Sequence, residues 1–297
     1  MSIVVTGANG FVGRAVVDRL PGARRLVRGS LDSPREAAMA IEGAHTIIHL
    51  AARLRGAPAD VFRDTVVASN NLIEAALAMR APPRIVLTSS LAVYGVASLR
   101  RNTIIDETTP IESAPRRRDL YAQAKLRQEK LFRDRYENLV VVRPGVVFGP
   151  GGTLLSTRVG LQVPGLFLFL GGDNRLPLTF VENCADAIVA VALRGVQGET
   201  YNIIDDDLPT AREYLSRYRE RTKLRHLPVP YPLLWLGADL LERYSTWSRG
   251  QLPAILTPYK VASMHKGMRY ANAKLKTLSW QPRISMDEAI GRTLEAA

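Results

Sequence analysis

The stretch "VVTGANGFVG" (residues 4–13) places three glycines, Gly7, Gly10 and Gly13, three residues apart after a short apolar run. Glycine permits backbone angles that are closed to other residues, and it lacks the Cβ that would keep a ligand away from the chain. A strand followed by such a turn and a helix therefore predicts close approach of the backbone to a ligand. The N–H groups at the helix N-terminus, near Phe11 and Val12, favour a phosphate as that ligand.

Apolar runs typical of buried strands alternate along the chain with helical patterns of roughly 10 to 15 residues. The strands are expected in "IVVTGANG", "RRLVRG", "HTIIHLAA", "RIVLTSSLAVYG" and "LVVVRPGVVFGPG", with helices such as "VVASNNLIEAALAMR" and "LYAQAKLRQEKLFRDRY" between them. Continuous apolar strands indicate a parallel sheet that is covered on both faces. The sequence thus predicts an α/β fold, a doubly wound parallel (Rossmann) sheet with a smaller C-terminal substrate-binding lobe and a ligand beyond the carboxyl ends of the strands.

The composition limits the possible functions. A chain of 297 residues with 46% apolar residues can bury a sizeable core. Its one cysteine, Cys184, excludes an intramolecular disulfide, and "SIVV" from residue 2 leaves no room for a signal peptide, so we expect a cytoplasmic protein. The net charge is +12, but the basic residues are scattered and accompany no recognised nucleic-acid motif. We expect a small-molecule substrate, no nucleic-acid partner and no metal.

Tyr121 and Lys125 in "YAQAK" are four residues apart on a predicted helix, which puts both side chains on one face. A strand that ends in hydroxyl groups, "LTSSLAVYG", precedes them by about thirty residues and should open at the same sheet edge. An ammonium group beside a tyrosine stabilises the phenolate and lowers a pKa that is otherwise near ~10. We therefore expect Lys125 to lower the pKa of Tyr121, while a serine hydroxyl holds the substrate oxygen during hydride transfer with a nicotinamide.

With these motifs the chain resembles the extended short-chain dehydrogenases/reductases, the NAD(P)-dependent epimerase/dehydratase group. "TGANGFVG" matches the family's TGxxGxxG, "SSLAVYG" its serine strand, "YAQAK" its YxxxK, and "RPGVVFGPG" the strand after the catalytic helix. The resemblance implies that Ser90, Tyr121 and Lys125 are catalytic, with Ser89 as the alternative serine. It implies dinucleotide contacts from Gly7, Asn9, Gly10, Phe11, Val12, Gly13, Leu50, Ala51, Ala52, Lys125, Pro144 and Val146, the last two at the nicotinamide end.

Two departures from the family pattern concern the cofactor side. Thr65 stands where the family usually carries an asparagine. The segment between "RRLVRG" and "SLDSPREAA", on the adenine side of the site, is shorter than in the family pattern by roughly ten residues or more. At the end of the second strand the sequence offers Arg28 and no acid until Asp32. Because arginine pairs with the 2′-phosphate of NADP, we expect NADP as the cofactor, with NAD possible if Arg28 is only a solvated strand-end residue.

The expected dinucleotide-binding Rossmann domain comprises residues 1–149, and the chain returns to it over residues 178–204. Residues 150–177 and 205–297 are expected to form mainly the substrate-binding lobe. "PLTFVENCADAIVAVAL" and the C-terminal tail resemble members similar to 3β-hydroxysteroid dehydrogenase. In "YPLLWLGADLLERYSTW" an apolar stripe at helical spacing predicts core of the lobe, with Trp235 outside the stripe as a contact to lipid or a membrane surface. The residues of that stripe are Leu233, Leu234, Leu240, Leu241 and Tyr244.

Three functional hypotheses follow. The first is an NADP-dependent oxidoreductase acting on a secondary alcohol or ketone that is sterol-like or otherwise apolar. The second is a nucleotide-sugar epimerase, dehydratase or ketoreductase with retained NAD, in which Arg175 and two arginine clusters, Arg100 with Arg101 and Arg116 to Arg118, hold a diphosphate. The third is a non-catalytic nucleotide-binding subunit. Family members commonly pair through two helices, here about 61–80 and 119–136, so a homodimer is expected.

Overall fold

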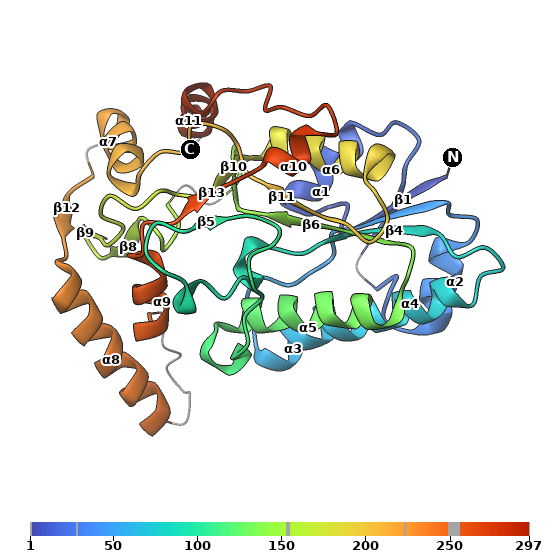
Figure 1. Cartoon of the computed structure of the whole chain (residues 1–297), viewed down its shortest axis with the longest axis horizontal. Coiled ribbons are helices and arrows are strands. Elements are labelled where there is room, and N and C mark those ends of the chain that lie inside the picture. Colours follow the sequence, from blue (N-terminus) through green and yellow to red (C-terminus); the bar gives the residue numbers. More distant parts are fainter. Residues whose placement is uncertain (1, 28, 153–154, 223, 249–255, 297) are drawn as a thin grey trace.

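A computed structural model describes residues 2–296 except for 28, 153–154, 223 and 249–255 (Figure 1). At its centre six strands form a sheet in the order β11-β6-β4-β3-β1-β2, and each neighbouring pair is parallel. These strands are β1 (Ile3–Thr6), β2 (Arg24–Leu26), β3 (Thr46–His49), β4 (Arg84–Thr88), β6 (Leu139–Pro144) and β11 (Thr200–Ile203). The predicted doubly wound α/β fold is confirmed. The winding reverses between β1 and β3, where such sheets open a ligand crevice.

Helices cover both faces of this sheet (Figure 1). One face carries α1 (Phe11–Asp18) and α6 (Val181–Arg194); the other carries α2 (Pro34–Ile41), α4 (Ala68–Leu77) and α5 (Leu120–Arg135). The short α3 (Pro58–Phe62) leads into α4 through a π-helical turn, Arg63–Val67. Successive apolar strand residues serve opposite faces, since Val4 and Ile47 pack toward α2 and α4 while Val5 and Ile48 pack toward α1 and α6. This explains why the strands are continuously apolar.

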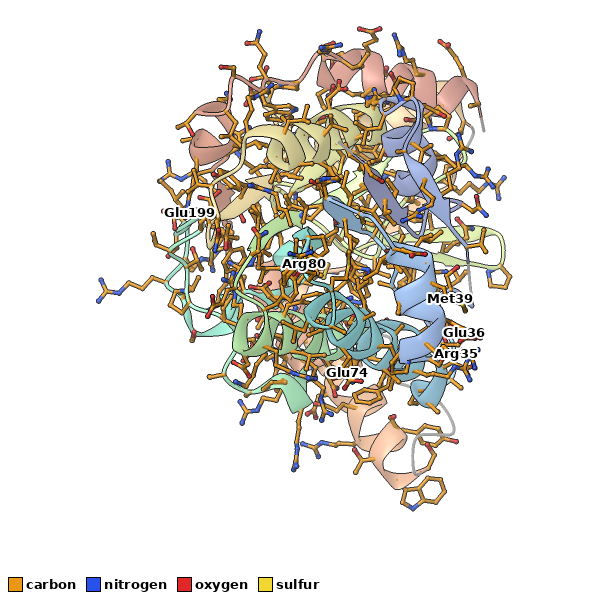
Figure 2. All side chains as sticks on the ribbon, turned by 90° about the vertical axis from the view of Figure 1, so that its right-hand side faces the viewer. Arg35, Glu36, Met39, Glu74, Arg80 and Glu199 are labelled. Atoms are coloured by element: carbon orange, nitrogen blue, oxygen red, sulfur yellow. The ribbon has the colours of Figure 1, made fainter. Side chains whose placement is uncertain are left out.

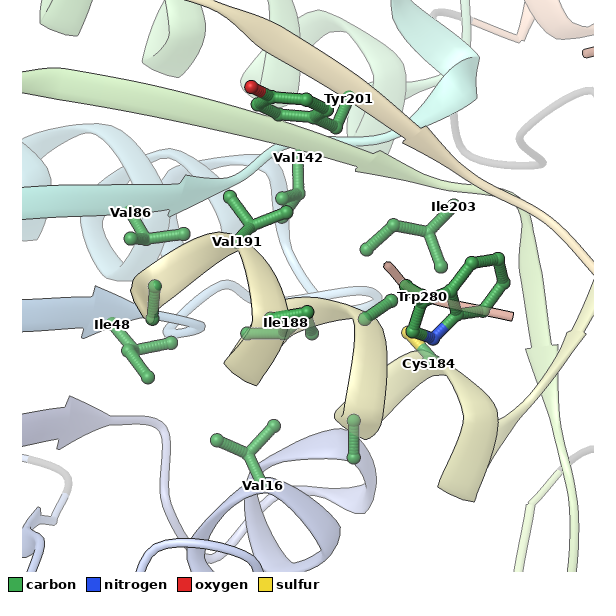
Figure 3. Close-up of a cluster of buried hydrophobic side chains, with 14 of the residues drawn as sticks. Val16, Ile48, Val86, Val142, Cys184, Ile188, Val191, Tyr201, Ile203 and Trp280 are labelled. Atoms are coloured by element: carbon green, nitrogen blue, oxygen red, sulfur yellow. The ribbon is translucent and has the colours of Figure 1, made fainter. Parts of the chain in front are cut away.

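The core on the α6 side also holds the cysteine (Figure 3). Ile188 and Val191 of α6 face Val142 of β6, and Cys184 lies in the same cluster beside Trp280. Cys184 is fully buried, and burial raises the pKa of its thiol. Trp280 donates its indole N–H to the Asn183 carbonyl at 3.3 Å, so the C-terminal segment returns to the sheet domain.

The remaining elements form a lobe beside the carboxyl ends of the strands. Its small sheets pair β7 (Val146–Phe148) with β10 (Leu178–Phe180), β5 (Ile104–Ile105) with β13 (Arg269–Tyr270), and β9 (Leu166–Phe169) with both β8 (Gly160–Val163) and β12 (His226–Pro228). Its helices are α7 (Ala211–Arg221), α8 (Tyr231–Trp247), α9 (Pro258–Met264) and α11 (Met286–Glu295). The short α10 (Ala273–Lys276) packs on the sheet domain, where Leu275 joins the core on the α6 side. Three 3₁₀ turns, Leu91–Val93, Val96–Ser98 and Pro115–Arg117, connect the lobe to the sheet domain.

The predicted role of the apolar stripe on α8 is wrong. Of its members only Leu234 is buried; it packs with Ala238 against Leu170 and against Val261 of α9. Leu233, Leu240, Leu241 and Tyr244 are about half exposed or more. Helical spacing identified residues on α8 that share a face, but α8 contacts the body through a narrower line of side chains. None of the helices in the described part of the chain is long and apolar enough to cross a membrane.

Candidate active site

The glycine turn between β1 and α1 depends on close backbone contacts. Gly7 has φ 66°, and a Cβ there would lie 2.9 Å from the Ala51 backbone nitrogen at the end of β3. A Cβ on Gly13 would lie only 2.1 Å from the Gly7 carbonyl oxygen. Gly10 precedes the first residue of α1, and no side chain caps this N-terminus. The first turn of α1 therefore keeps backbone N–H groups available to a phosphate.

A cavity of about 650 Å³ opens at this turn. Twelve of the residues expected in the site line it: Gly7, Gly10, Phe11, Val12, Gly13, Leu50, Ala52, Ser90, Tyr121, Lys125, Pro144 and Val146. Asn9 and Ala51 lie beside the cavity and hold the turn, since the Asn9 carbonyl accepts from Arg14 Nε at 3.1 Å and the Ala51 N–H donates to Thr6 Oγ1 at 3.1 Å. Arg28 lies outside the described residues.

These residues fit a bound dinucleotide. The glycines leave room that a Cβ would fill, and the uncapped end of α1 suits a pyrophosphate. The Thr88 hydroxyl, at the end of β4, lines the same cavity and has no hydrogen-bond partner within the described structure. Pro144 and Val146, at the end of β6 and the start of β7, line the region where the family pattern implies the nicotinamide.

Lys125 is buried behind the cavity wall. Its Nζ donates to the Thr88 carbonyl at 2.7 Å and to Gln128 Oε1 at 2.8 Å. Burial lowers the pKa of Lys125 to about 7, against the opposing charge of Glu129. That carboxylate is itself paired with the Arg143 guanidinium at 2.5 Å. Near neutral pH the Lys125 amine therefore exchanges between its charged and neutral forms.

Tyr121 shows a pKa shift opposite to the one expected. Burial raises the pKa of Tyr121, the hydrogen bond with Ser90 pulls it back, and the nearby Asp119 charge adds to the rise. Lys125 does not lower it, because its ammonium donates to Thr88 and Gln128 instead. The phenol is consequently protonated at neutral pH. Ser90 accepts from the Ala92 N–H at 3.1 Å, which fixes its side chain beside Tyr121.

A buried polar chain that the sequence did not reveal extends from Lys125. Gln128 Nε2 donates to Ser69 Oγ at 2.8 Å and to the Thr65 carbonyl in the π-helical turn at 3.4 Å. His49 is hydrogen bonded to Ser69 at 3.0 Å and to Thr6 at 2.8 Å. Burial and the Lys125 charge lower the pKa of His49 to about 3, so it is neutral. The only sequence signals were polar residues within apolar segments.

Thr65 itself does not reach the cavity. Its hydroxyl accepts from the Arg53 N–H at 3.0 Å, on the chain that leaves β3. The position that carries an asparagine in the family therefore contributes its backbone carbonyl to the network around Lys125. A π-helical turn exposes such a carbonyl, because it interrupts the regular hydrogen bonds of the helix.

The other end of the cavity is cationic. Its wall holds Arg55, Arg117, Arg118, Arg158 and Lys260, whereas Asp119 is the acid among its lining residues. Arg118 donates to the Tyr94 carbonyl at 3.1 Å and lies over the Tyr259 ring. Arg55 and Arg117 are solvent-exposed. This end can therefore attract an anionic group.

Only some of the arginines that were expected to hold a diphosphate line the cavity. Arg117 and Arg118 line the cavity, whereas Arg116, Arg100 and Arg101 do not. Arg175 is also absent from the wall, and its Nη1 donates to the Leu208 carbonyl at 2.7 Å. The hypothesis that Arg175 holds a diphosphate in this cavity is wrong, because the side chain links two loops of the lobe instead.

Residues 3–203 match the family model described as the NAD dependent epimerase/dehydratase family. The chain belongs to this family. The matched region runs from β1 to β11 and contains the glycine turn, Ser90, Tyr121 and Lys125. The protein is thus an NAD(P)-binding oxidoreductase of the extended short-chain dehydrogenase type. The alternative of a non-catalytic subunit is set aside, since the family and its curated relatives are enzymes.

Two curated relatives in this family have different substrates in their names. The chain is 24% identical to N-acetyl-alpha-D-glucosaminyl-diphospho-ditrans,octacis-undecaprenol 4-epimerase of Escherichia coli O157:H7, covering 82% of this chain and 80% of the relative. It is 24% identical to the human sterol-4-alpha-carboxylate 3-dehydrogenase, decarboxylating, covering 98% and 87%. The fold is similar to that of the Thermus thermophilus UDP-glucose 4-epimerase in complex with NAD, with a TM-score of 0.70, 19% identity, and coverage of 100% and 98%.

Proposed function

We propose that the protein interconverts a secondary alcohol and a ketone in an amphiphilic substrate, one that has an apolar body and a carboxylate or phosphate group. The observation that carries the proposal is the wall of the cavity, which joins the glycine turn, Ser90, Tyr121 and Lys125 to a cationic end. NADP is the proposed cofactor, on the strength of Arg28 at the end of the second strand.

When it is bound, the nicotinamide supplies or accepts the hydride. The protein's own residues hold the substrate oxygen and move its proton. Because its pKa is raised, Tyr121 carries the proton that a ketone oxygen needs on reduction, and Ser90 orients the same oxygen. Lys125 donates to the Thr88 carbonyl and to Gln128, and so orders the buried polar chain beside the cavity.

The cations argue for the anionic part of the substrate. Arg117 and Arg158 line the cavity without an ion pair in the described structure, so an incoming acid would meet unpaired guanidinium groups. The two relatives support the same class of compound, because one is named for an undecaprenol diphosphate and the other for a sterol carboxylate. Each name combines an apolar body with an acidic group.

The test compares a long-chain 3-oxo acid with its methyl ester as substrates for reduction. Arg117→Gln and Arg158→Gln should each raise KM for the acid by about tenfold or more, since a hydrogen bond to a charged group is worth about 1.5 to 3 kcal/mol. Neither should change turnover of the ester. Arg116→Gln, one residue outside the cavity wall, is the matched control and should change neither. Equal use of acid and ester by the wild type would refute the anionic substrate.

A second candidate is epimerisation of a sugar diphosphate with retained NAD. The cationic end of the cavity suits a diphosphate as well as a carboxylate, and the first relative named above has that activity. Mass spectrometry of freshly purified protein separates the two. Stoichiometric NAD that survives purification favours epimerisation, whereas an exchangeable NADP favours the dehydrogenase.

A further inference from the structure

The outward side of α8 carries an exposed apolar stripe, which shares Leu233, Leu240 and Tyr244 with the stripe predicted from the sequence. Its residues are spaced three, four, four and three positions apart, which places them on one face of the helix. They are Leu233, Leu236, Leu240, Tyr244 and Trp247, and they are 61%, 51%, 58%, 47% and 78% exposed. Scattered apolar residues are normal on protein surfaces, but a contiguous apolar patch marks an interaction site.

The way α8 is attached directs this stripe away from the protein. Leu234 and Ala238, which lie on the opposite side of the helix, fasten α8 to Val261 of α9. The other side of α9 lines the cavity through Tyr259, Lys260, Ser263 and Met264. α9 thus separates α8 from the cavity. In Figures 1 and 2, α8 extends beyond the rest of the molecule, and among the described residues its stripe stays about half exposed or more.

We propose that α8 is an interfacial helix that docks the protein on an anionic lipid bilayer. The stripe combines leucines with Tyr244 and Trp247, and aromatic residues of this kind favour the boundary between lipid and water. A helix that is held on the protein by one side and presents an apolar face on another lies in that boundary rather than across it. At 17 residues α8 is also too short and too polar to span a bilayer.

The charge of the protein selects an anionic surface as the occupant. The polar side of α8 is balanced, since Arg243 pairs with Asp239 at 2.9 Å. Positive charge comes instead from exposed arginines outside α8, among them Arg225 before β12 and Arg55 and Arg117 at the cavity. An anionic bilayer attracts every copy of a chain that carries a net charge of +12.

Docking would place the cavity beside the lipid surface, with α9 as the shared wall. This consequence rests on the proposed function, because only an amphiphilic substrate would reach the cavity from a bilayer. The docking of α8 on the bilayer does not depend on the proposed function. A protein that binds vesicles but reduces no amphiphile would overturn the proposed function alone, and failure to bind vesicles would leave the alcohol and ketone chemistry standing.

The experiment is co-sedimentation of the full chain with phosphatidylglycerol-containing vesicles and with pure phosphatidylcholine vesicles. The wild type should sediment with the anionic vesicles and be released by salt, since screening weakens surface attraction. The triple variant L236E/L240E/W247E should bind at least about a hundredfold more weakly, because burial of one large apolar side chain is already worth more than tenfold. Met39→Glu is the matched control, since Met39 is 61% exposed on α2 at the far end of the molecule and should change nothing (Figures 1 and 2).

Tryptophan fluorescence gives a readout that does not depend on the triple variant folding. Emission of the wild type should shift to shorter wavelength with anionic vesicles. Trp247→Phe should reduce that shift, and Trp235, which is 42% exposed on the same helix, accounts for the remainder. A wild type that stays in the supernatant, or a folded triple variant that sediments equally well, would overturn the proposal. So would light scattering that shows an α8-dependent dimer without vesicle binding, because a second copy would then be the occupant.

Discussion

The substitution Gly13→Ala examines the turn on which the dinucleotide site depends. Its added Cβ would lie 2.1 Å from the Gly7 carbonyl oxygen, and ordinary contact begins at 3.4 Å, so the first turn of α1 must move by about 3.4 − 2.1 = 1.3 Å. No rotamer change can relieve a clash with a backbone oxygen. Overpacking of this kind costs about 1 to 3 kcal/mol of stability. The displaced N–H groups should also weaken dinucleotide binding by more than about tenfold, the worth of a charge-assisted hydrogen bond.

Gly10→Ala supplies the matched control within the same turn. Its Cβ would lie 3.1 Å from the same Gly7 oxygen, so a few tenths of an ångström suffice and stability should stay within about 1 kcal/mol of wild type. Urea unfolding without dinucleotide measures the stability of both variants, and titration with NADP(H) and NAD(H) measures binding. Unfolding of Gly13→Ala at the wild-type urea concentration, together with normal dinucleotide binding, would contradict the predicted clash. So would a Gly10→Ala variant that is less stable than Gly13→Ala.

Four further predictions concern chemistry, pH, cofactor choice and assembly. Tyr121→Phe should lower kcat by roughly two to four decades in a steady-state assay while dinucleotide binding is retained, because it removes the proton donor. The pKa of His49 is about 3 in the folded protein and near 6.5 in the unfolded chain, so the free energy of unfolding should fall as pH drops through this window, by on the order of 5 kcal/mol in full. Denaturant curves of His49→Asn should show a shallower loss of stability between pH 7 and 4.5. Arg28→Ala should weaken NADP(H) by about 1.5 to 3 kcal/mol and leave NAD(H) nearly unchanged in paired titrations; equal losses for both would mean that Arg28 does not read the 2′-phosphate. Light scattering at micromolar concentration should report a homodimer through α4 and α5, where Leu77 and Leu120 are exposed, and it should be unaffected by the α8 variant; a monomer would contradict it.

Local sequence patterns were sufficient to predict the sheet and the residues on its rim. The glycine turn was recognisable because its three glycines stand between a strand and a helix, and Tyr121 with Lys125 because four residues make one turn of helix. These features depend on neighbours in the sequence. The cationic end of the cavity depends on the tertiary fold, since Arg55, Arg158 and Lys260 come from three distant segments.

Two errors have the same physical origin in burial. Spacing placed Lys125 beside Tyr121, but the pKa of the phenol is set first by loss of water, which a sequence pattern does not report. On α8 apolar residues occur on more than one side of the helix, and periodicity does not reveal which of them the protein covers. Leu234 is covered, whereas Leu233, its immediate neighbour, is not.

The burial of Cys184 makes the chain a ready background for site-directed labelling. Its single thiol, on α6, is buried in the same cluster as Trp280 and is held in the protonated, unreactive form by its raised pKa. A maleimide dye would therefore modify only a cysteine introduced by design. A dye on a cysteine introduced at position 247 would be quenched by lipid-borne quenchers according to its depth in the bilayer. A dye on a cysteine introduced at position 39 would stay in water and escape that quenching. Neither variant requires removal of the native cysteine.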